Sequence, residues 1–247
     1  MKNSYKIFKN PAELASTLAK EITERIIATA NKERIYSISL SGGSTPELLY
    51  SFLFDELVNA VPWEFVHLFW GDERCVSPAH PDSNYGNILK FLNEKAGLPS
   101  ENIHRIIGEN EPGAEAVRYS AEISDMLPSR DGLPVFDLIL LGMGEDGHTA
   151  SIFPDQIRLI DSARICEVAV HPVSRQRRIT LTGKVINNTE AVVILVTGEK
   201  KAQVIGKIFN NTSDKDKYPV SHIKPVYGSL DWYLDRGAAT FVDSRIL

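Results

Sequence analysis

The sequence predicts an α/β fold in which a mainly parallel sheet is covered by helices on both faces. Short apolar runs of the kind that form buried strands recur along the chain, and amphipathic segments with helical spacing separate most of them. No repeat or linker-like segment divides the 247 residues, of which 43% are hydrophobic. A chain of this length can bury one sizeable core, so we expect a single domain over residues 1–247.

Five segments are predicted to be strands because they are short and almost continuously apolar. They are residues 36–40, 67–71, 136–142, 163–170 and 191–197. Helical periodicity is clearest in residues 11–32, and similar patterns predict helices near 83–96, 112–127, 199–210 and 229–236. Ligands of parallel sheets bind beyond the carboxyl ends of the strands, so the loops that follow these strands are expected to carry the function.

The composition favours an enzyme that acts on a small molecule. A formal net charge of −5 provides no field that attracts nucleic acid, so a phosphate ligand has to be held by a few local cations. No apolar run approaches the roughly 20 residues of a membrane helix, and the N-terminal segment lacks a signal-peptide core. We therefore expect a cytoplasmic protein with no membrane partner. Cys75 and Cys166 lack the spacing of a metal or redox pair and are expected to be reduced packing residues.

The first predicted strand is followed by SGGSTP, residues 41–46. Gly43 lets the backbone approach a ligand, Ser44 or Thr45 can cap the next helix, and Pro46 suits a first helical position. The free N–H groups and positive dipole end of such a helix attract phosphate. An ordinary helix cap fits the pattern equally well. No lysine follows the glycines, so the segment is not a Walker A loop.

The second predicted strand is followed by three successive charges, Asp72, Glu73 and Arg74. Charged residues at a strand end are difficult to explain by packing, so at least one of them is expected to face the ligand. The alternative is a local ion pair at the sheet edge. The next segment, PDSNYGN, is predicted to be a turn that leads into a helix capped by Asp82 or Ser83.

The third predicted strand is followed by a G-x-G-x-x-G pattern formed by Gly142, Gly144 and Gly147. This pattern binds a dinucleotide when its last glycine packs a full helix against the strand. Pro154 comes too soon after it for a helix of ~10 to 15 residues. The two acidic residues between the glycines would also repel a pyrophosphate. We therefore reject a bound dinucleotide at this loop.

The same loop places His148 beyond a strand end, two residues after Asp146. Imidazole takes up and returns a proton near neutral pH, so His148 is the candidate general base. Asp146 can accept a hydrogen bond from the other ring nitrogen and hold the useful tautomer. A purely structural histidine is the alternative. The remaining histidines lack such a setting and are expected to be structural: His67, His80, His104, His171 and His222.

Candidate cations occur at two later positions in the chain. Arg178 lies in an alternating run, and Lys200 and Lys201 begin the helix after the strand at 191–197. Arginine grips phosphate with two hydrogen bonds and lysine supplies a point charge, so one of each is predicted to converge on a monophosphate. The alternative is that these are solvated charges.

The chain contains the segments SGGSTP, WGDER, PDSNYGN, LGMGEDGHTASIFP, RITLT, VTGEKKA and GSLDWYLDRGAA. Together they resemble the 6-phosphogluconolactonases, the lactone hydrolases of the oxidative pentose phosphate pathway. The resemblance covers nearly the whole chain, and GEDGHTASIFP is its most specific part. It implies a three-layer α/β/α fold, hydrolysis of 6-phospho-D-glucono-1,5-lactone to 6-phospho-D-gluconate, and no metal or other cofactor.

The resemblance also implies roles for single residues. His148 would activate water. Lys201 is preferred to Lys200 because the family pattern places the lysine directly before an alanine. Asp72 would either position water or shape the cleft. The remaining substrate-binding residues that the resemblance implies are Gly43, Ser44, Thr45, Arg74 and Arg178.

Two other functions remain open at this point. The wider superfamily includes glucosamine-6-phosphate deaminase, which usually has Asn-Glu-Pro where this chain has residues 151–154 and Asp-Glu-Tyr where it has residues 72–74. Both differences favour the lactonase. A non-catalytic sugar-phosphate sensor on the same fold is the second alternative. The expected partner is a small sugar-phosphate lactone, without nucleic acid, and the chain is expected to be a monomer or weak homo-oligomer.

Overall fold

The centre of the molecule is a seven-stranded sheet in the order β1-β12-β11-β8-β2-β3-β5. The computed structural model describes residues 2–92 and 97–243. All neighbouring strands of this sheet are parallel. In chain order the strands are β1 (Lys2–Phe8), β2 (Tyr36–Leu40), β3 (Val66–Trp70), β5 (Ile103–His104), β8 (Leu138–Gly142), β11 (Ala191–Val196) and β12 (Ser229–Asp235).

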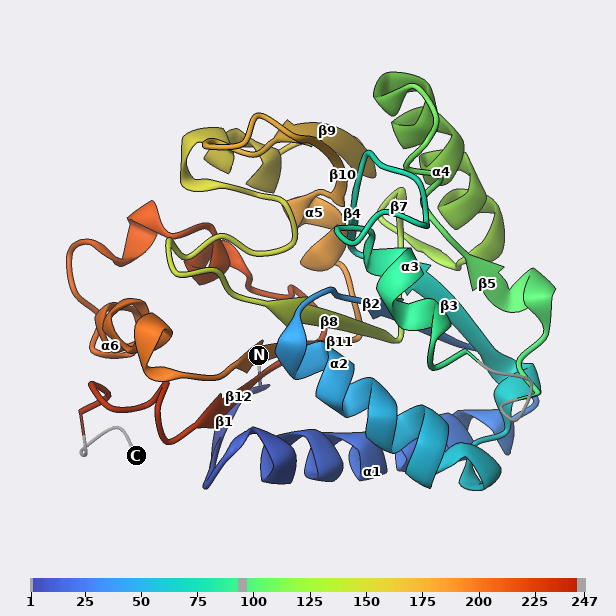
Figure 1. Cartoon of the computed structure of the whole chain (residues 1–247), viewed down its shortest axis with the longest axis horizontal. Helices are drawn as coiled ribbons and strands as arrows, with labels where there is room; N and C mark the ends of the chain where they lie inside the picture. The colour runs from blue at the N-terminus through green and yellow to red at the C-terminus, as the bar shows by residue number, and fades with distance from the viewer. Residues whose placement is uncertain (1, 93–96, 244–247) are drawn as a thin grey trace.

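Helices cover the sheet on both faces, which confirms the predicted three-layer α/β/α fold (Figure 1). Helices α1 and α2 pack together on one side, and α4, α5 and a small second sheet lie on the other. The bounds are α1 (Pro11–Ala30), α2 (Ser44–Ser51), α3 (Asn84–Leu89), α4 (Pro112–Met126), α5 (Gly183–Ile186) and α6 (Ala202–Phe209).

Helix α1 illustrates how local sequence sets an element. The side chain of Asn10 caps the helix by accepting from the Glu13 backbone N–H at 2.9 Å, and Pro11 follows as the first helical residue. The residues that repeat at helical spacing are all buried against the sheet: Leu14, Leu18, Ile22 and Ile26. The predicted helix at 11–32 is therefore present with nearly its predicted bounds.

The second sheet is antiparallel, in the order β4-β10-β9. It comprises β4 (Asp72–Arg74), β9 (Cys166–Val170) and β10 (Arg177–Leu181), while β6 (Ser129–Arg130) and β7 (Leu133–Pro134) form a separate pair. The strand predicted at 163–170 thus exists, but it belongs to this small sheet. Strand β4 begins just beyond the end of β3, so the small sheet stands at the carboxyl edge of the large one.

The helix predicted at 229–236 is wrong, because this segment is β12, a strand between β1 and β11. Leu230, Trp232 and Leu234 alternate with polar or amphipathic residues, a period of two that suits a strand. The partner strand β1 was not predicted either. Two further helices are shorter than predicted: α3 ends at Leu89, and a 3-10 turn at Glu199–Lys201 precedes α6. The part of the first prediction at residues 93–96 lies outside the described residues.

Both cysteines are free thiols, as expected. Burial raises the pKa of Cys166 to about 12 and that of Cys75 to about 11, so neither is a reactive thiolate at neutral pH. Among the described residues, no helix is both long and apolar enough to span a bilayer.

Candidate active site

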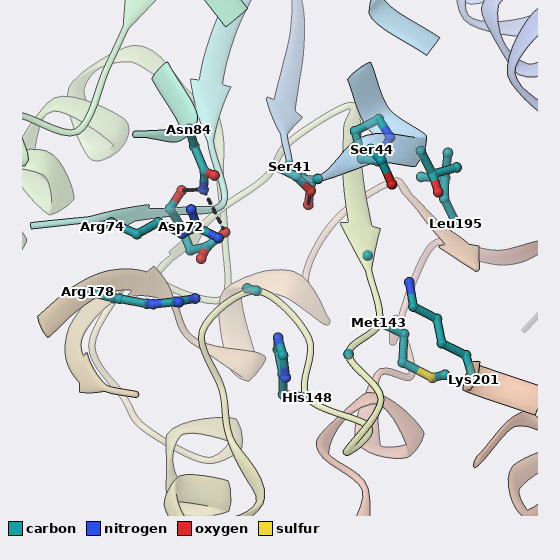
Figure 2. Close-up of a pocket in the computed structure, with 17 residues that line it drawn as sticks. Ser41, Ser44, Asp72, Arg74, Asn84, Met143, His148, Arg178, Leu195 and Lys201 are labelled. Carbon is teal, nitrogen blue, oxygen red and sulfur yellow. Dashed lines mark hydrogen bonds between the residues drawn. The ribbon is translucent and has the colours of Figure 1, made fainter. Parts of the chain in front are cut away.

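A cavity of about 250 Å³ opens at the carboxyl ends of β2, β8 and β11 (Figure 2). Parallel strands end at the same edge of a sheet, so the loops that follow them gather there. Eight of the predicted site residues line this cavity: Gly43, Ser44, Thr45, Asp72, Arg74, His148, Arg178 and Lys201. The ninth, Asp146, contacts the His148 ring.

The loop after β2 presents the start of helix α2 to the cavity. Gly43 occupies the cap position with a φ of 108°, a conformation that favours glycine, and no side chain caps the helix. Ser44 is therefore the first helical residue and Pro46 the third, which corrects the predicted placement of both. The Thr45 and Thr197 hydroxyls lie 2.6 Å apart and link the helix start to the segment after β11. The uncapped N–H groups and positive dipole end face the cavity and suit an anion.

The loop after β8 folds back on itself so that His148 faces the cavity. The Gly144 N–H donates to the His148 carbonyl at 2.9 Å, and the Gly147 N–H donates to the Gly144 carbonyl at 3.1 Å. Gly147 has a φ of 78° and packs on the Tyr218 ring, where a side chain would collide. At Gly144 a Cβ atom would lie 2.2 Å from His148 Nδ1. These glycines shape a tight turn around the imidazole.

His148 and Asp146 form a close pair. The distance from His148 Nδ1 to Asp146 Oδ1 is 2.6 Å, and the same oxygen accepts from the His148 backbone N–H at 3.1 Å. Burial would raise the pKa of Asp146, but the hydrogen bond and charge of His148 outweigh it, so the pKa lies below its usual value. The carboxylate therefore stays ionised and holds Nδ1, which leaves Nε2 as the nitrogen available to a ligand.

Strand β4 explains why the three charges after β3 differ in role. Successive side chains of a strand point to opposite faces, so Asp72 and Arg74 face the cavity while Glu73 points away. Glu73 is buried and accepts from the backbone N–H groups of Arg74, Asn84 and Tyr85. Burial raises its pKa in spite of these bonds. Glu73 therefore secures the start of α3, where Ser83 is the cap as predicted.

Arg178 and Arg74 lie directly opposite each other on the paired strands β10 and β4. Arg178 is only 9% exposed, and burial lowers its pKa from the ordinary value. The single hydrogen bond from its guanidinium goes to Ser151 Oγ at 3.5 Å, within the described part of the chain. The Ser151 hydroxyl in turn donates to Asp72 at 2.6 Å. These contacts hold Arg178 in place but leave most of its donors unused.

Lys200 and Lys201 point in different directions. Lys200 is highly exposed and lies 3.8 Å from Glu145, whereas Lys201 lines the cavity beside the start of α2. Burial lowers the pKa of Lys201. Figure 2 shows Lys201 and Arg178 on opposite sides of His148. Both cations line the same cavity, and their convergence on one phosphate stays a prediction.

Sequence reasoning missed the residues that support the site. Phe153 is fully buried, with its ring centroid 4.8 Å from that of His148, and the Arg178 guanidinium carbon lies 5.5 Å from the same centroid. His171 also packs against this ring in a T-shaped arrangement, with the ring centroids 5.2 Å apart. Asn84, which lines the cavity, donates to the Asp72 carbonyl at 2.8 Å. The only local signals were the position of Phe153 soon after His148 and that of Asn84 at a helix start.

His67 and His104 lie away from the cavity and bond to each other at 2.9 Å, and His104 also bonds to Glu122 at 2.9 Å. Among the described residues, no three histidine, cysteine, aspartate or glutamate side chains gather as metal ligands.

The comparisons with known proteins agree with this geometry. A family described as glucosamine-6-phosphate isomerases/6-phosphogluconolactonase matches residues 9–232. A 6-phosphogluconolactonase from Aggregatibacter actinomycetemcomitans is 42% identical over 226 residues, which cover 91% of this chain and 95% of that protein. The crystal structure of 6-phosphogluconolactonase from Leishmania guyanensis superposes with a TM-score of 0.85 at 29% identity, over 99% of this chain and 100% of that one.

A monomeric glucosamine-6-phosphate deaminase superposes with a TM-score of 0.78 at 19% identity, over 98% of this chain and 100% of that one. At this identity the likeness concerns the fold alone. The family match and the lactonase relatives extend over most of the chain. The chain therefore belongs to the glucosamine-6-phosphate isomerase/6-phosphogluconolactonase family.

Proposed function

We propose that this chain is a hydrolase that converts 6-phospho-D-glucono-1,5-lactone into 6-phospho-D-gluconate. The observation that carries the proposal is the His148–Asp146 pair at 2.6 Å, which faces a small cavity with cations on its walls. Relatives named 6-phosphogluconolactonase that are 42% identical over about nine-tenths of the chain support the same reaction.

The substrate phosphate is proposed to bind at the start of α2. The uncapped N–H groups of Ser44 and Thr45, the positive helix end and the Lys201 ammonium group converge on this side of the cavity. Binding energy from the phosphate, which takes no part in the chemistry, then holds the lactone carbonyl near His148.

In the chemical step, the Nε2 atom of His148 takes a proton from water while the water oxygen attacks C1 of the lactone. Asp146 stabilises the imidazolium that forms, because its carboxylate is bonded to Nδ1. The tetrahedral intermediate collapses as the bond from C1 to the ring oxygen breaks. The imidazolium returns its proton to that oxygen, which becomes the C5 hydroxyl group, and the new carboxylic acid loses its proton to solvent. No acyl-enzyme is formed.

The test is a lactonase assay of the purified chain beside the His148→Asn variant. We expect the variant to lose about 10²-fold or more in kcat while it retains affinity for 6-phosphogluconate, since asparagine cannot act as the base. A fully active variant would remove His148 from this role. Ammonia release from glucosamine 6-phosphate, measured in parallel, identifies a deaminase, and ligand binding by a wild-type chain without turnover identifies a sensor.

We also propose that the chain acts in the cytoplasm, as a single domain and without nucleic acid. One hydrophobic cluster that runs from Phe8 in β1 to Val242 near the end of the described residues supports the single domain. A monomer or weak homo-oligomer is expected, and size-exclusion chromatography over a range of protein concentrations tests this.

A further inference from the structure

The cavity has two cationic walls on opposite sides of His148 (Figure 2). Lys201 and the start of α2 form one wall. Arg74 and Arg178, from β4 and β10, form the other. The phosphate site proposed above uses only the first wall, so the question is which substrate group the second wall binds.

Arg178 is poorly satisfied within the protein. Its side chain is nine-tenths buried, its Nε atom has no hydrogen-bond partner, and no carboxylate among the described residues lies within ion-pair distance. A buried guanidinium without a paired anion is costly because its hydration has been lost. The cost falls when an oxygen-rich, negatively charged ligand group takes up the unused donors.

The position of Arg74 strengthens this conclusion. Arg74 and Arg178 are direct cross-strand partners of an antiparallel ladder, and both line the cavity. Directly opposite residues point to the same face of a sheet, and like charges in such a pair repel. Asp72 offsets part of this charge, because it lies on the same face of β4 and is tied to Ser151. The pair still presents an excess of positive charge to the cavity.

The position of Phe153 indicates which substrate group lies beside the wall formed by Arg74 and Arg178. The Arg178 guanidinium and the His148 imidazole both lie against this one ring, at 5.5 and 4.8 Å from its centroid. Arg178 is therefore a neighbour of the general base, and the base must lie beside C1. In a 6-phosphorylated 1,5-lactone, C1 and C5 both flank the ring oxygen, but the carbonyl oxygen on C1 and the phosphate on C6 project in different directions. A cation beside the base is therefore placed to meet the C1 oxygens.

We infer that Arg178, with Arg74 beside it, binds the C1 oxygens of the substrate and not its phosphate. This inference rests on the proposed function. Arg178 donates to the carbonyl oxygen of the lactone, to the oxyanion as water adds to C1, and to the carboxylate of the product. Arginine suits all three, because its planar fork offers parallel donors to a carboxylate and a fixed positive charge to an oxyanion.

Two product-like ligands that differ only at C1 test the inference. Both 6-phospho-D-gluconate and D-glucitol 6-phosphate carry the phosphate, but only the first carries a carboxylate. Isothermal titration calorimetry of the Arg178→Ala variant is expected to show at least a tenfold loss of affinity for 6-phospho-D-gluconate and less than a twofold change for D-glucitol 6-phosphate. The matched control is Lys201→Ala, which is expected to weaken both ligands by similar factors.

Arg74→Ala is expected to show the same ligand preference as Arg178→Ala. Arg74 is more exposed than Arg178, so Arg74→Ala replaces Arg178→Ala in the test if the latter variant does not fold. Arg178→Lys is a second replacement, because it keeps the positive charge but lacks the planar fork of donors. Kinetically, Arg178→Ala is expected to lower kcat by about 10²-fold, the typical effect of removing an oxyanion donor. Lys201→Ala is expected mainly to raise KM.

Equal weakening of both ligands by Arg178→Ala, or no weakening of either, would overturn the inference. The first outcome would place Arg178 on the phosphate. Failure of the proposed function has a different signature: the wild-type chain would not hydrolyse the lactone, whereas the preference for the carboxylate-bearing ligand would remain measurable.

Discussion

Replacement of Gly144 by alanine tests whether the exact position of the imidazole matters. An added Cβ atom would lie 2.2 Å from both Cε1 and Nδ1 of His148 and 2.8 Å from Asp146 Oδ1. Non-bonded carbon contacts have their optimum at about 3.5 Å or more, so the ring has to move by about 1.3 Å to accept the methyl group. A misplacement of about 1 Å costs on the order of 10²-fold in rate. We therefore expect kcat to fall about 100-fold, which is about 2.7 kcal/mol of transition-state stabilisation.

The assay compares initial rates of lactone hydrolysis, corrected for the uncatalysed reaction, with the affinity for 6-phosphogluconate. Affinity is expected to change little, because the proposed phosphate site, formed by Lys201 and the start of α2, lies outside the loop that carries Gly144. Gly142→Ala is the matched control, since its Cβ atom would meet only Ser41 Oγ at 3.8 Å, an ordinary contact. Its kcat is expected to stay within about threefold of the wild type. A Gly144→Ala variant with wild-type kcat and an unchanged melting temperature would refute the link between imidazole position and rate.

Three further predictions concern charge. Asp146→Asn should lower kcat by about 10²-fold with little change in product affinity, because the amide no longer stabilises the imidazolium; lactonase kinetics test this. Burial lowers the pKa of Lys201, whereas a bound phosphate favours its charged form. The affinity for 6-phosphogluconate should therefore fall as the pH rises, and the fall should begin below lysine's ordinary pKa of 10.5. Calorimetry across this range should find no such fall in Lys201→Arg. Burial and the nearby His104 lower the pKa of His67, so the native state binds a proton less readily than the unfolded chain. The free energy of unfolding should therefore fall as the pH drops through 6.5, the pKa of histidine in the unfolded chain. Urea titrations at about pH 7.5 and about pH 5.5 test this, and the fall should be smaller in His67→Asn.

Much of the site could be predicted because its parts are local. The spacing of Asp146 and His148, the glycines around them and the SGGSTP loop each lie within a few residues of a strand end. Parallel strands place such ends at one edge of the sheet, so the clustering of these loops followed from the fold class alone. Local spacing also predicted that no long helix follows the loop, and a 3-10 segment over Pro154–Ile160 stands there.

Other features depend on pairing between distant segments. The misassigned segment at 229–236 forms a strand because β1 and β11 flank it on both sides. Its own alternation was too short to exclude a helix, and tertiary pairing made the choice. In the same way, the sequence of residues 166–170 predicted a buried strand but not the sheet to which it belongs; pairing with β10 places it in the small sheet.

The sequence by itself determined the fold class, the chemistry of the His148 loop and the residue types that surround the ligand, because each is written in local spacing and composition. Only the tertiary structure decided where the cations lie around His148. Arg178 stands opposite Arg74 because antiparallel register joins two strands about 100 residues apart in the sequence, and side-chain packing places it beside Phe153, across His148 from Lys201 (Figure 2). No local pattern encodes that register.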